Sequence, residues 1–158
     1  MALANQEKHL LLSTGNKSEL AVGYCTLYGD MNGGLSVIGD LYKTNVFKLC
    51  NWLDSEDSIN HRKSYMLDTD VDIIGENIRT KAPSAELGPD QLDTDSLPPY
   101  SILDNILKGI IEEKKDLILK IISLIKKAEF KRKQAPQILK LSSQSLGSDW
   151  RVPIAISY

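Results

Sequence analysis

The apolar run His9-Leu10-Leu11-Leu12 constrains the fold most strongly, because turn-forming residues and then a helical pattern follow it at once. A short continuous apolar run that ends in a loop is typical of a strand buried on both faces. Asn16 can cap the following helix, and Glu19 stands three residues later, as in a capping box. Apolar residues then recur at helical spacing up to Gly29, where we expect the helix to end: Leu20, Ala21, Tyr24 and Leu27.

A second apolar run, Leu35–Ile38, follows a glycine-rich loop and predicts another short buried strand. The order strand, helix, strand favours a parallel sheet and hence an α/β fold. From Thr44, apolar residues at helical spacing predict an amphipathic helix that ends at the polar run 54–58.

The remainder of the chain divides into three intervals. Residues 53–99 are polar, acidic and proline-containing, and are predicted to form a largely irregular loop region. Residues 101–133 are predicted to be helical, with Ser101 as the first cap and with two helices rather than one, because the polar run 112–116 interrupts the apolar pattern. Residues 134–158 are predicted to form an extended and irregular tail.

The composition excludes several classes of protein. The 158 residues are 42% hydrophobic, which suits one globular domain. A net charge of -2 predicts neither a nucleic-acid nor a membrane partner. No stretch has the length of a transmembrane helix, and Cys25 and Cys50 form no CxxC pair, so we expect a reduced, cytoplasmic protein without a structural zinc site.

Three polar side chains follow the predicted strands, at the edge where α/β sheets bind nucleotides and metals. Thr14 and Glu19 come after the first strand, and Lys43 comes after the second and can offer a charge to a polyphosphate. Position alone leaves plainer roles open: a turn former for Thr14, a capping residue for Glu19 and a solvated lysine for Lys43. Asp30, in the glycine-rich loop, is equally compatible with binding ribose or amide groups and with forming a turn.

A basic cluster lies near the end of the helical interval: Lys126, Lys127, Lys131, Arg132 and Lys133. Such a cluster can complement the helix dipole or bind phosphate, and the sequence leaves both roles open. Neither GxGxxG nor GxxxxGK[ST] occurs, and His9 and His61 have no partner at a recognisable spacing, so no catalytic triad is predicted.

Ordered segments along nearly the whole chain resemble one known family, the glutamine-dependent NAD synthetases. These segments are Leu11–Glu19, Tyr28–Gly34, Lys43–Thr44, Lys81–Gln91, Leu97–Tyr100, Phe130–Pro136 and Pro153–Ala155. The resemblance implies that residues 1–158 form the C-terminal portion of a ligase domain. Its fold would be a Rossmann-like three-layer sandwich of the adenine nucleotide alpha hydrolase type, present here as the C-terminal half followed by helices.

The reaction implied by this resemblance is the ATP-dependent amidation of deamido-NAD to NAD through an adenylated intermediate, with ammonia from glutamine. By the same resemblance, Thr14, Lys43 and Ser84 would bind ATP, with Lys43 also catalytic. Glu19, Asp30 and Lys131 would bind deamido-NAD, and Glu19 would also hold Mg²⁺. The family is usually dimeric, so a homodimer is expected.

Two parts of the family pattern are missing from these residues. The family's pyrophosphate-binding Ser-Gly-Gly-x-Asp-Ser loop does not occur in them, and neither does a glutaminase domain. We therefore expect a fragment that is inactive alone and pairs with the missing N-terminal half. The alternative is a non-catalytic remnant or assembly module that pairs with a full-length synthetase, and a third reading makes the basic helix a binder of membrane surfaces or acidic partners.

Overall fold

The computed structural model describes residues 1–113 and 119–150. The chain divides into two compact units, one made of Met1–Lys43 with Tyr100–Tyr158 and the other of Thr44–Pro99. Each unit is described by itself. The family-like segment Pro153–Ala155 and part of the predicted interruption at 112–116 lie outside the described residues.

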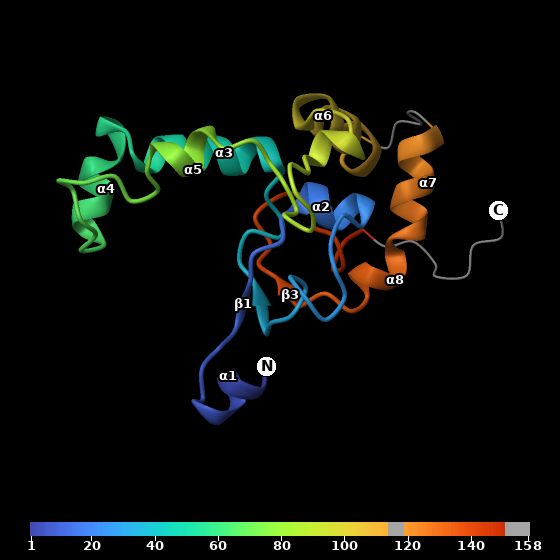
Figure 1. Ribbon diagram of the computed structural model, residues 1–158, viewed down its shortest axis with the longest axis horizontal. Helices are drawn as coiled ribbons and strands as arrows, with labels where there is room; N and C mark the ends of the chain where they lie inside the picture. The colour runs from blue at the N-terminus through green and yellow to red at the C-terminus, as the bar shows by residue number, and fades with distance from the viewer. Residues whose placement is uncertain (114–118, 151–158) are drawn as a thin grey trace. The chain divides into compact units, whose positions relative to one another are not determined.

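The first unit contains a three-stranded parallel sheet (Figure 1). Its strands are β1 (Leu12–Ser13), β2 (Leu35–Ser36) and β3 (Gln137–Ile138), in the order β1-β2-β3. The predicted parallel arrangement of the first two strands is confirmed, with Leu12 opposite Leu35. The predicted extended and irregular tail contains a third strand after Pro136, which pairs with the free side of β2 and satisfies backbone groups of that strand.

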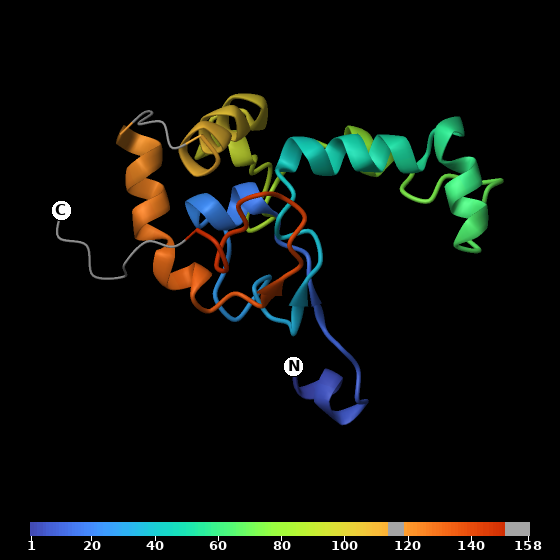
Figure 2. The ribbon, with the colours of Figure 1, turned by 180° about the vertical axis from the view of Figure 1, so that it is seen from behind.

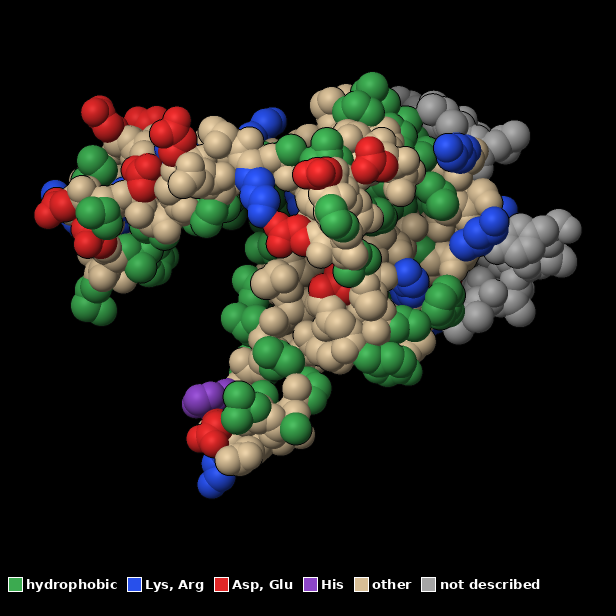
Figure 3. All heavy atoms as spheres, in the orientation of Figure 1, with side chains coloured by type: hydrophobic (Ala, Val, Ile, Leu, Met, Phe, Trp, Pro, Cys, Tyr) green, Lys and Arg blue, Asp and Glu red, His purple; other side chains and the backbone are tan. Residues whose placement is uncertain are grey.

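The apolar run had predicted a strand buried on both faces. That prediction is wrong, because β1 is an edge strand with one exposed face. Leu10 and Leu12 are 64% and 49% exposed, whereas Ser13 is buried. Because alternate residues of a strand point to opposite faces, the buried face of β1 receives a serine and the exposed face receives leucine. Figure 3 shows hydrophobic side chains on the surface of the arm that joins α1 (Ala2–Gln6) to the sheet.

Helix α2 (Lys17–Val22) lies between the sheet and α6, as both ribbon views show (Figures 1 and 2). The predicted capping box is present: the Glu19 N–H donates to Asn16 Oδ1 (3.1 Å) and the Asn16 N–H donates to Glu19 Oε2 (3.2 Å). The helix ends at Gly23 rather than at Gly29. Gly23 adopts a left-handed conformation with φ 74°, which is favourable for glycine because it has no Cβ to clash with the backbone.

In its described part, the interval 101–133 contains three helices, α6 (Tyr100–Ile111), α7 (Leu119–Lys127) and α8 (Glu129–Arg132). All three contact α2. Ser101 lies inside the first turn of α6 instead of capping it, because the helix begins at Tyr100. The core of the unit is formed by apolar side chains from these helices and from the tail: Leu20, Ala21, Leu103, Leu107, Ile111, Ile121, Ile125 and Leu146.

The second unit begins inside α3 (Lys43–Leu53), which confirms the amphipathic helix expected from Thr44. Residues 53–99 also contain short helical segments: η1 (Glu56–Ser58), α4 (Ile59–Ser64), α5 (Glu76–Thr80) and η2 (Asp93–Asp95). Buried polar groups fix the connections between them. The Asp54 carboxylate accepts the N–H groups of Ile73, Ile74 and Gly75, and the Arg62 guanidinium donates to the carbonyl of Val71. Within the described residues, no helix is both long and apolar enough to cross a bilayer.

Candidate functional site

Two of the candidate residues, Glu19 and Lys43, form an ion pair in the first unit. Lys43 Nζ lies 2.8 Å from Glu19 Oε1, and the two side chains are 20% and 16% exposed. The ring of Tyr100 lies under the ammonium, 5.4 Å from its centroid, so an aromatic face also stabilises the cation. The fold has therefore brought together the carboxylate and the lysine that the sequence assigned to the edge of the sheet.

Both residues of this pair are held at helix starts. Glu19 is fixed in the first turn of α2, where its other oxygen accepts the Asn16 N–H. Lys43 is the first residue of α3, and its backbone N–H donates to Ser18 Oγ (2.9 Å). Ser18 Oγ donates in turn to Asp104 Oδ1 (2.5 Å) on α6. The pair is thus built on three helices rather than on a loose loop.

Thr14 lies in the loop between β1 and α2 and is exposed. The position confirms the strand-to-loop transition expected from the sequence, and the loop leads directly to the Asn16 cap. A hydroxyl there is accessible to a ligand from solvent.

Asp30 has a local role in the described structure. Its carboxylate accepts the Thr26 N–H (2.6 Å), and its backbone carbonyl accepts the Ser13 hydroxyl (3.0 Å). These bonds anchor the loop after α2 to the end of β1. They correspond to the turn-forming role that the sequence left open beside ligand binding.

Lys131 caps the C-terminal end of α2. Its ammonium donates to the carbonyls of Gly23 and Cys25, both at 2.7 Å. With six residues, α2 is about 9 Å long, so Lys131 and Glu19 lie at opposite ends of one helix. Burial raises the pKa of the neighbouring Cys25 thiol to about 11, so this thiol stays protonated at neutral pH.

Ser84 belongs to the second unit. It is half-buried, and its hydroxyl accepts the Glu86 N–H (3.0 Å). It lines an open hollow of about 510 Å³ together with Lys81, Gln91 and Leu92.

Arg132, from the basic cluster, bonds carbonyls in the last turns of α2 and α7, which corresponds to the helix-dipole role that the sequence left open for that cluster. It is 7% exposed, and its guanidinium donates to the carbonyls of Ala21 (2.6 Å) and Ile125 (2.5 Å) and to Glu129 (2.8 Å). It therefore joins α2, α7 and α8 from inside. The spacing Glu129-x-x-Arg132 is a signal for such a pair, since residues three apart on a helix lie side by side.

Sequence reasoning also missed a buried ion pair between Lys17 and Asp40 (3.0 Å), both fully buried. Lys17 Nζ also donates to Ser142 Oγ (2.8 Å) and to the Gln144 carbonyl (2.6 Å). Burial alone would raise the pKa of Asp40, but N–H donors from Ser142 and Leu141 and the contact with Lys17 outweigh it and lower that pKa. A lysine in the first turn of a helix opposes the dipole, and this was the available signal.

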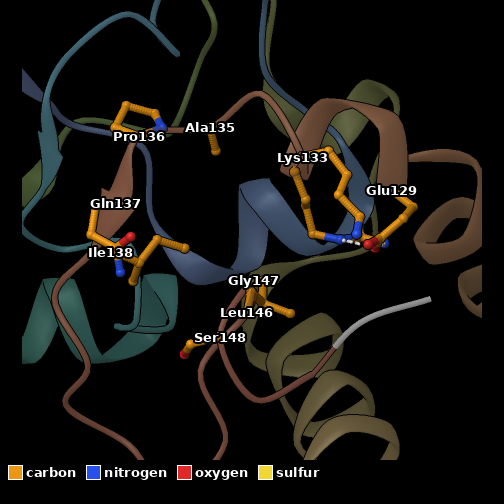
Figure 4. Close-up of a pocket in the computed structure, with 10 residues that line it drawn as sticks. Glu129, Lys133, Ala135, Pro136, Gln137, Ile138, Leu146, Gly147 and Ser148 are labelled. Carbon is orange, nitrogen blue, oxygen red and sulfur yellow. Dashed lines mark hydrogen bonds and ion pairs between the residues drawn. The ribbon is translucent and has the colours of Figure 1, made fainter. Parts of the chain in front are cut away.

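A cavity of about 220 Å³ lies elsewhere in the first unit, between α8 and two tail segments (Figure 4). Its lining includes Glu129, Arg132, Lys133, Pro136, Ile138 and Leu146. None of the six candidate residues lines it, so we place the candidate site at the Lys43–Glu19 pair and not in this cavity.

The metal-binding capacity of the candidate site rests on one carboxylate. Among residues 1–113 and 119–150, no three His, Cys, Asp or Glu side chains gather at metal-binding distances. Mg²⁺ is commonly held by one or two carboxylates, with water and phosphate oxygens completing its shell. Glu19, partly exposed and charged, fits the role of such a single ligand.

Comparison with known proteins decides the family. The family model described as NAD synthase matches residues 1–135. The chain belongs to the NAD synthase family. The resemblance found in the sequence segments is thereby confirmed.

Curated relatives in the NAD synthase family show how much of each protein the similarity covers. The glutamine-dependent NAD(+) synthetase of Synechocystis is 51% identical over 170 residues, covering 100% of this chain and 28% of the relative. The enzyme of the same name from Thermotoga maritima is 45% identical, covering 98% of this chain and 27% of the relative. The chain thus spans less than a third of these relatives and matches their C-terminal part.

A solved structure supports the α/β fold class. A glutamine-dependent NAD(+) synthetase from Cytophaga hutchinsonii superposes with a TM-score of 0.68, covering 99% of this chain and 26% of that one. At 20% identity this likeness concerns the fold alone. The predicted Rossmann-like α/β architecture of the NAD synthase family is confirmed.

Proposed function

We propose that this chain is the C-terminal portion of a glutamine-dependent NAD synthetase ligase domain and takes part in the ATP-dependent amidation of deamido-NAD to NAD. The observation that carries the proposal is the Lys43–Glu19 contact of 2.8 Å at the paired starts of α3 and α2. Membership of the NAD synthase family and the names of the relatives supply the reaction class.

The proposed reaction has two steps. A carboxylate oxygen of deamido-NAD attacks the α-phosphorus of ATP, and the bond to pyrophosphate breaks. Ammonia, derived from glutamine, then attacks the carbonyl carbon, loses a proton and displaces AMP to leave the amide. Because the first step brings one anion onto another, positive charge at the phosphates lowers its barrier.

Lys43 is the proposed catalytic cation. In the described state its charge is already paired with Glu19, so binding of a polyphosphate would exchange one anionic partner for another rather than desolvate a free lysine. Thr14 and Ser84 would each contribute a hydroxyl to ATP. Asp30 and Lys131 would contact deamido-NAD, and for this purpose Lys131 would share its donors with the end of α2.

Mg²⁺ bound at Glu19 would neutralise phosphate charge and orient the triphosphate. The chain's own contribution is to hold the Glu19 carboxylate at the start of α2 through the Asn16 capping box. Lys43 lies within reach of the same carboxylate, so Glu19 would serve the lysine in the unliganded chain and the metal once it is bound.

We further propose that these residues act only together with the remainder of a synthetase, in a cytoplasmic assembly that is a homodimer or a complex with an N-terminal ligase portion. The 158 residues contain no Ser-Gly-Gly-x-Asp-Ser loop to enclose pyrophosphate with backbone amides. A glutaminase portion would supply the ammonia.

The test is NAD formation from deamido-NAD, ATP, Mg²⁺ and ammonia. The purified chain is assayed alone and after mixing with the Synechocystis synthetase truncated before the region that this chain matches. We expect no turnover alone and turnover after mixing. Robust turnover by the chain alone would overturn the requirement for a partner portion, and co-purification without turnover would favour the non-catalytic assembly module.

A further inference from the structure

A chain of buried hydrogen bonds connects the core of the first unit to the backbone of Lys43. Asp104 is 1% exposed, and its Oδ1 accepts the Ser18 hydroxyl at 2.5 Å. Ser18 is 0% exposed, and its oxygen accepts the Lys43 N–H at 2.9 Å. The 2.5 Å contact lies at the short end of the range of O–H···O hydrogen bonds.

This arrangement gives Ser18 a fixed orientation. A serine hydroxyl has one proton to donate and lone pairs to accept. Because the Ser18 hydroxyl donates its hydrogen bond to the Asp104 carboxylate, the lone pairs of Ser18 Oγ are directed to the Lys43 N–H. The first N–H groups of a helix have no partner within it, and the Ser18 side chain from α2 satisfies one of them at the start of α3.

The same face of α6 also meets the other end of Lys43. Tyr100 precedes Asp104 by four residues, one turn of the helix, and its ring lies 5.4 Å from the Lys43 ammonium. Lys43 is therefore held at its backbone through Asp104 and Ser18, and at its ammonium between Tyr100 and Glu19. Displacement of the backbone would move the ammonium away from both partners.

We propose that Ser18 and Asp104 are positioning residues for Lys43: they set the start of α3 so that the ammonium rests between Glu19 and Tyr100, ready for a polyphosphate. Ser18 and Asp104 hold Lys43 in this position in the unliganded chain. The role of this position in ATP binding rests on the proposed function, and each of the two can fail without the other.

Competitive amine labelling of the unliganded full chain, read by mass spectrometry, tests the geometry without nucleotide or turnover. An amine held between a carboxylate and a ring reacts slowly, so the Lys43 rate reports whether the ammonium is in place. Exposed Lys8 serves as the reference amine, and Lys17, which is 0% exposed, reports whether the fold is intact. The variants are Ser18→Ala, Asp104→Ala and Asp104→Asn, with Ser101→Ala, an exposed serine of α6, as the matched control.

We expect Ser18→Ala and Asp104→Ala to raise the Lys43 rate about threefold relative to Lys8, towards the rate in Glu19→Gln, while Lys17 stays unreactive. Asp104→Asn retains an acceptor for the serine and should restore most of the protection, and Ser101→Ala should change nothing. An unchanged Lys43 rate in folded Ser18→Ala overturns the proposal. A parallel rise at Lys17 also overturns it, because the two residues would then be supporting the fold as a whole.

Discussion

Glu19 carries two interactions at once, one on each carboxylate oxygen. Oε2 accepts the Asn16 N–H at 3.2 Å and Oε1 accepts the Lys43 ammonium at 2.8 Å. The capping role that the sequence offered as an alternative to ligand binding is therefore real, and it fixes the carboxylate that the ligand-binding role would need. Capping and the proposed ligand binding would therefore not compete at Glu19.

Replacement of Lys43 by methionine separates stability from catalysis. We expect Lys43→Met to lower kcat of the completed synthetase about 100-fold or more, because a preorganised charge is lost where negative charge develops. The stability of the chain should change by less than about 1 kcal/mol, since the ion pair is partly exposed. NAD formation and urea unfolding measure the two effects.

Lys140→Met is the matched control, because Lys140 forms an exposed ion pair with Asp149 at 2.9 Å. It should leave both kcat and stability unchanged. A Lys43→Met variant with the turnover of the parent would remove Lys43 from the mechanism.

Helix α2 is short, and both of its ends are held by specific side chains. Asn16 and Glu19 hold its N-terminus, and Lys131 and Arg132 bind the carbonyls at its C-terminus. A helix of six residues is not stable by itself, so these contacts and the packing against α6, α7 and α8 maintain it. The element that carries Glu19 thus depends on residues far away in the sequence.

Arg132→Met should destabilise the first unit by about 3 kcal/mol, because the buried Glu129 carboxylate would lose its partner. The double variant Arg132→Met with Glu129→Leu should recover most of that loss, since no unpaired charge remains. Urea unfolding of both variants measures this, with exposed Lys133→Met as the control. Equal destabilisation of the single and double variants would contradict the explanation.

The Lys17–Asp40 ion pair binds the tail segment 141–144 to the start of α2. This pair should make the free energy of unfolding depend on pH. The folded-state pKa of Asp40 is lowered, so its contribution is complete above the unfolded value of about 4 and is lost as the pH falls through the folded value. Stability measured against pH below about 4 should therefore fall less steeply in Asp40→Asn than in the parent.

The Asp40→Asn variant should also be less stable at neutral pH, by about 3 kcal/mol, because buried Lys17 would lose the nearer of its two carboxylate partners and keep only partly exposed Glu112, at 3.5 Å. Asp149→Asn is the control, as Asp149 is partly exposed and pairs with exposed Lys140. An Asp40→Asn variant whose stability followed the same acid profile as the parent would show that the Lys17–Asp40 pair does not govern acid unfolding.

At the scale of the whole molecule, β1 forms one edge of the sheet, and no other described strand pairs with its outer side. β1 pairs with β2 on one side, and Leu12 in β1 and Leu10 just before it are 49% and 64% exposed. Exposed apolar edges favour association with further chain segments. A partner portion that completes the synthetase would be expected to cover this edge.

Leu10→Lys should therefore leave the stability of the chain unchanged within about 0.5 kcal/mol, since the side chain is already in solvent. It should weaken binding to the truncated Synechocystis partner by at least about tenfold, because a charge would be placed in an apolar interface. Leu141→Lys, at a leucine 56% exposed in the tail, is the control. Equal affinities of the two variants, measured by titration calorimetry, would place the interface elsewhere.

The sequence by itself determined the features that depend on neighbours along the chain: the capping box at α2, the amphipathic helix α3, the parallel pairing of the first two strands, and the family, through ordered motifs. These features follow from spacings of three or four residues and from short apolar runs, because interactions between neighbours along the chain are enough to form them. The placement of Glu19 and Lys43 at helix starts belongs to this group, because it follows from the capping residue and the strand ends.

Tertiary structure decided which charges are buried and which strand lies at the edge. Lys17, Asp40 and Arg132 resemble surface residues in the sequence, and they are enclosed only because their partners arrive from distant segments. The leucines of β1 remain exposed for the converse reason, since no described segment covers that side of the strand. The burial of a side chain depends on contacts with segments far away in the sequence, so a local sequence pattern does not predict it.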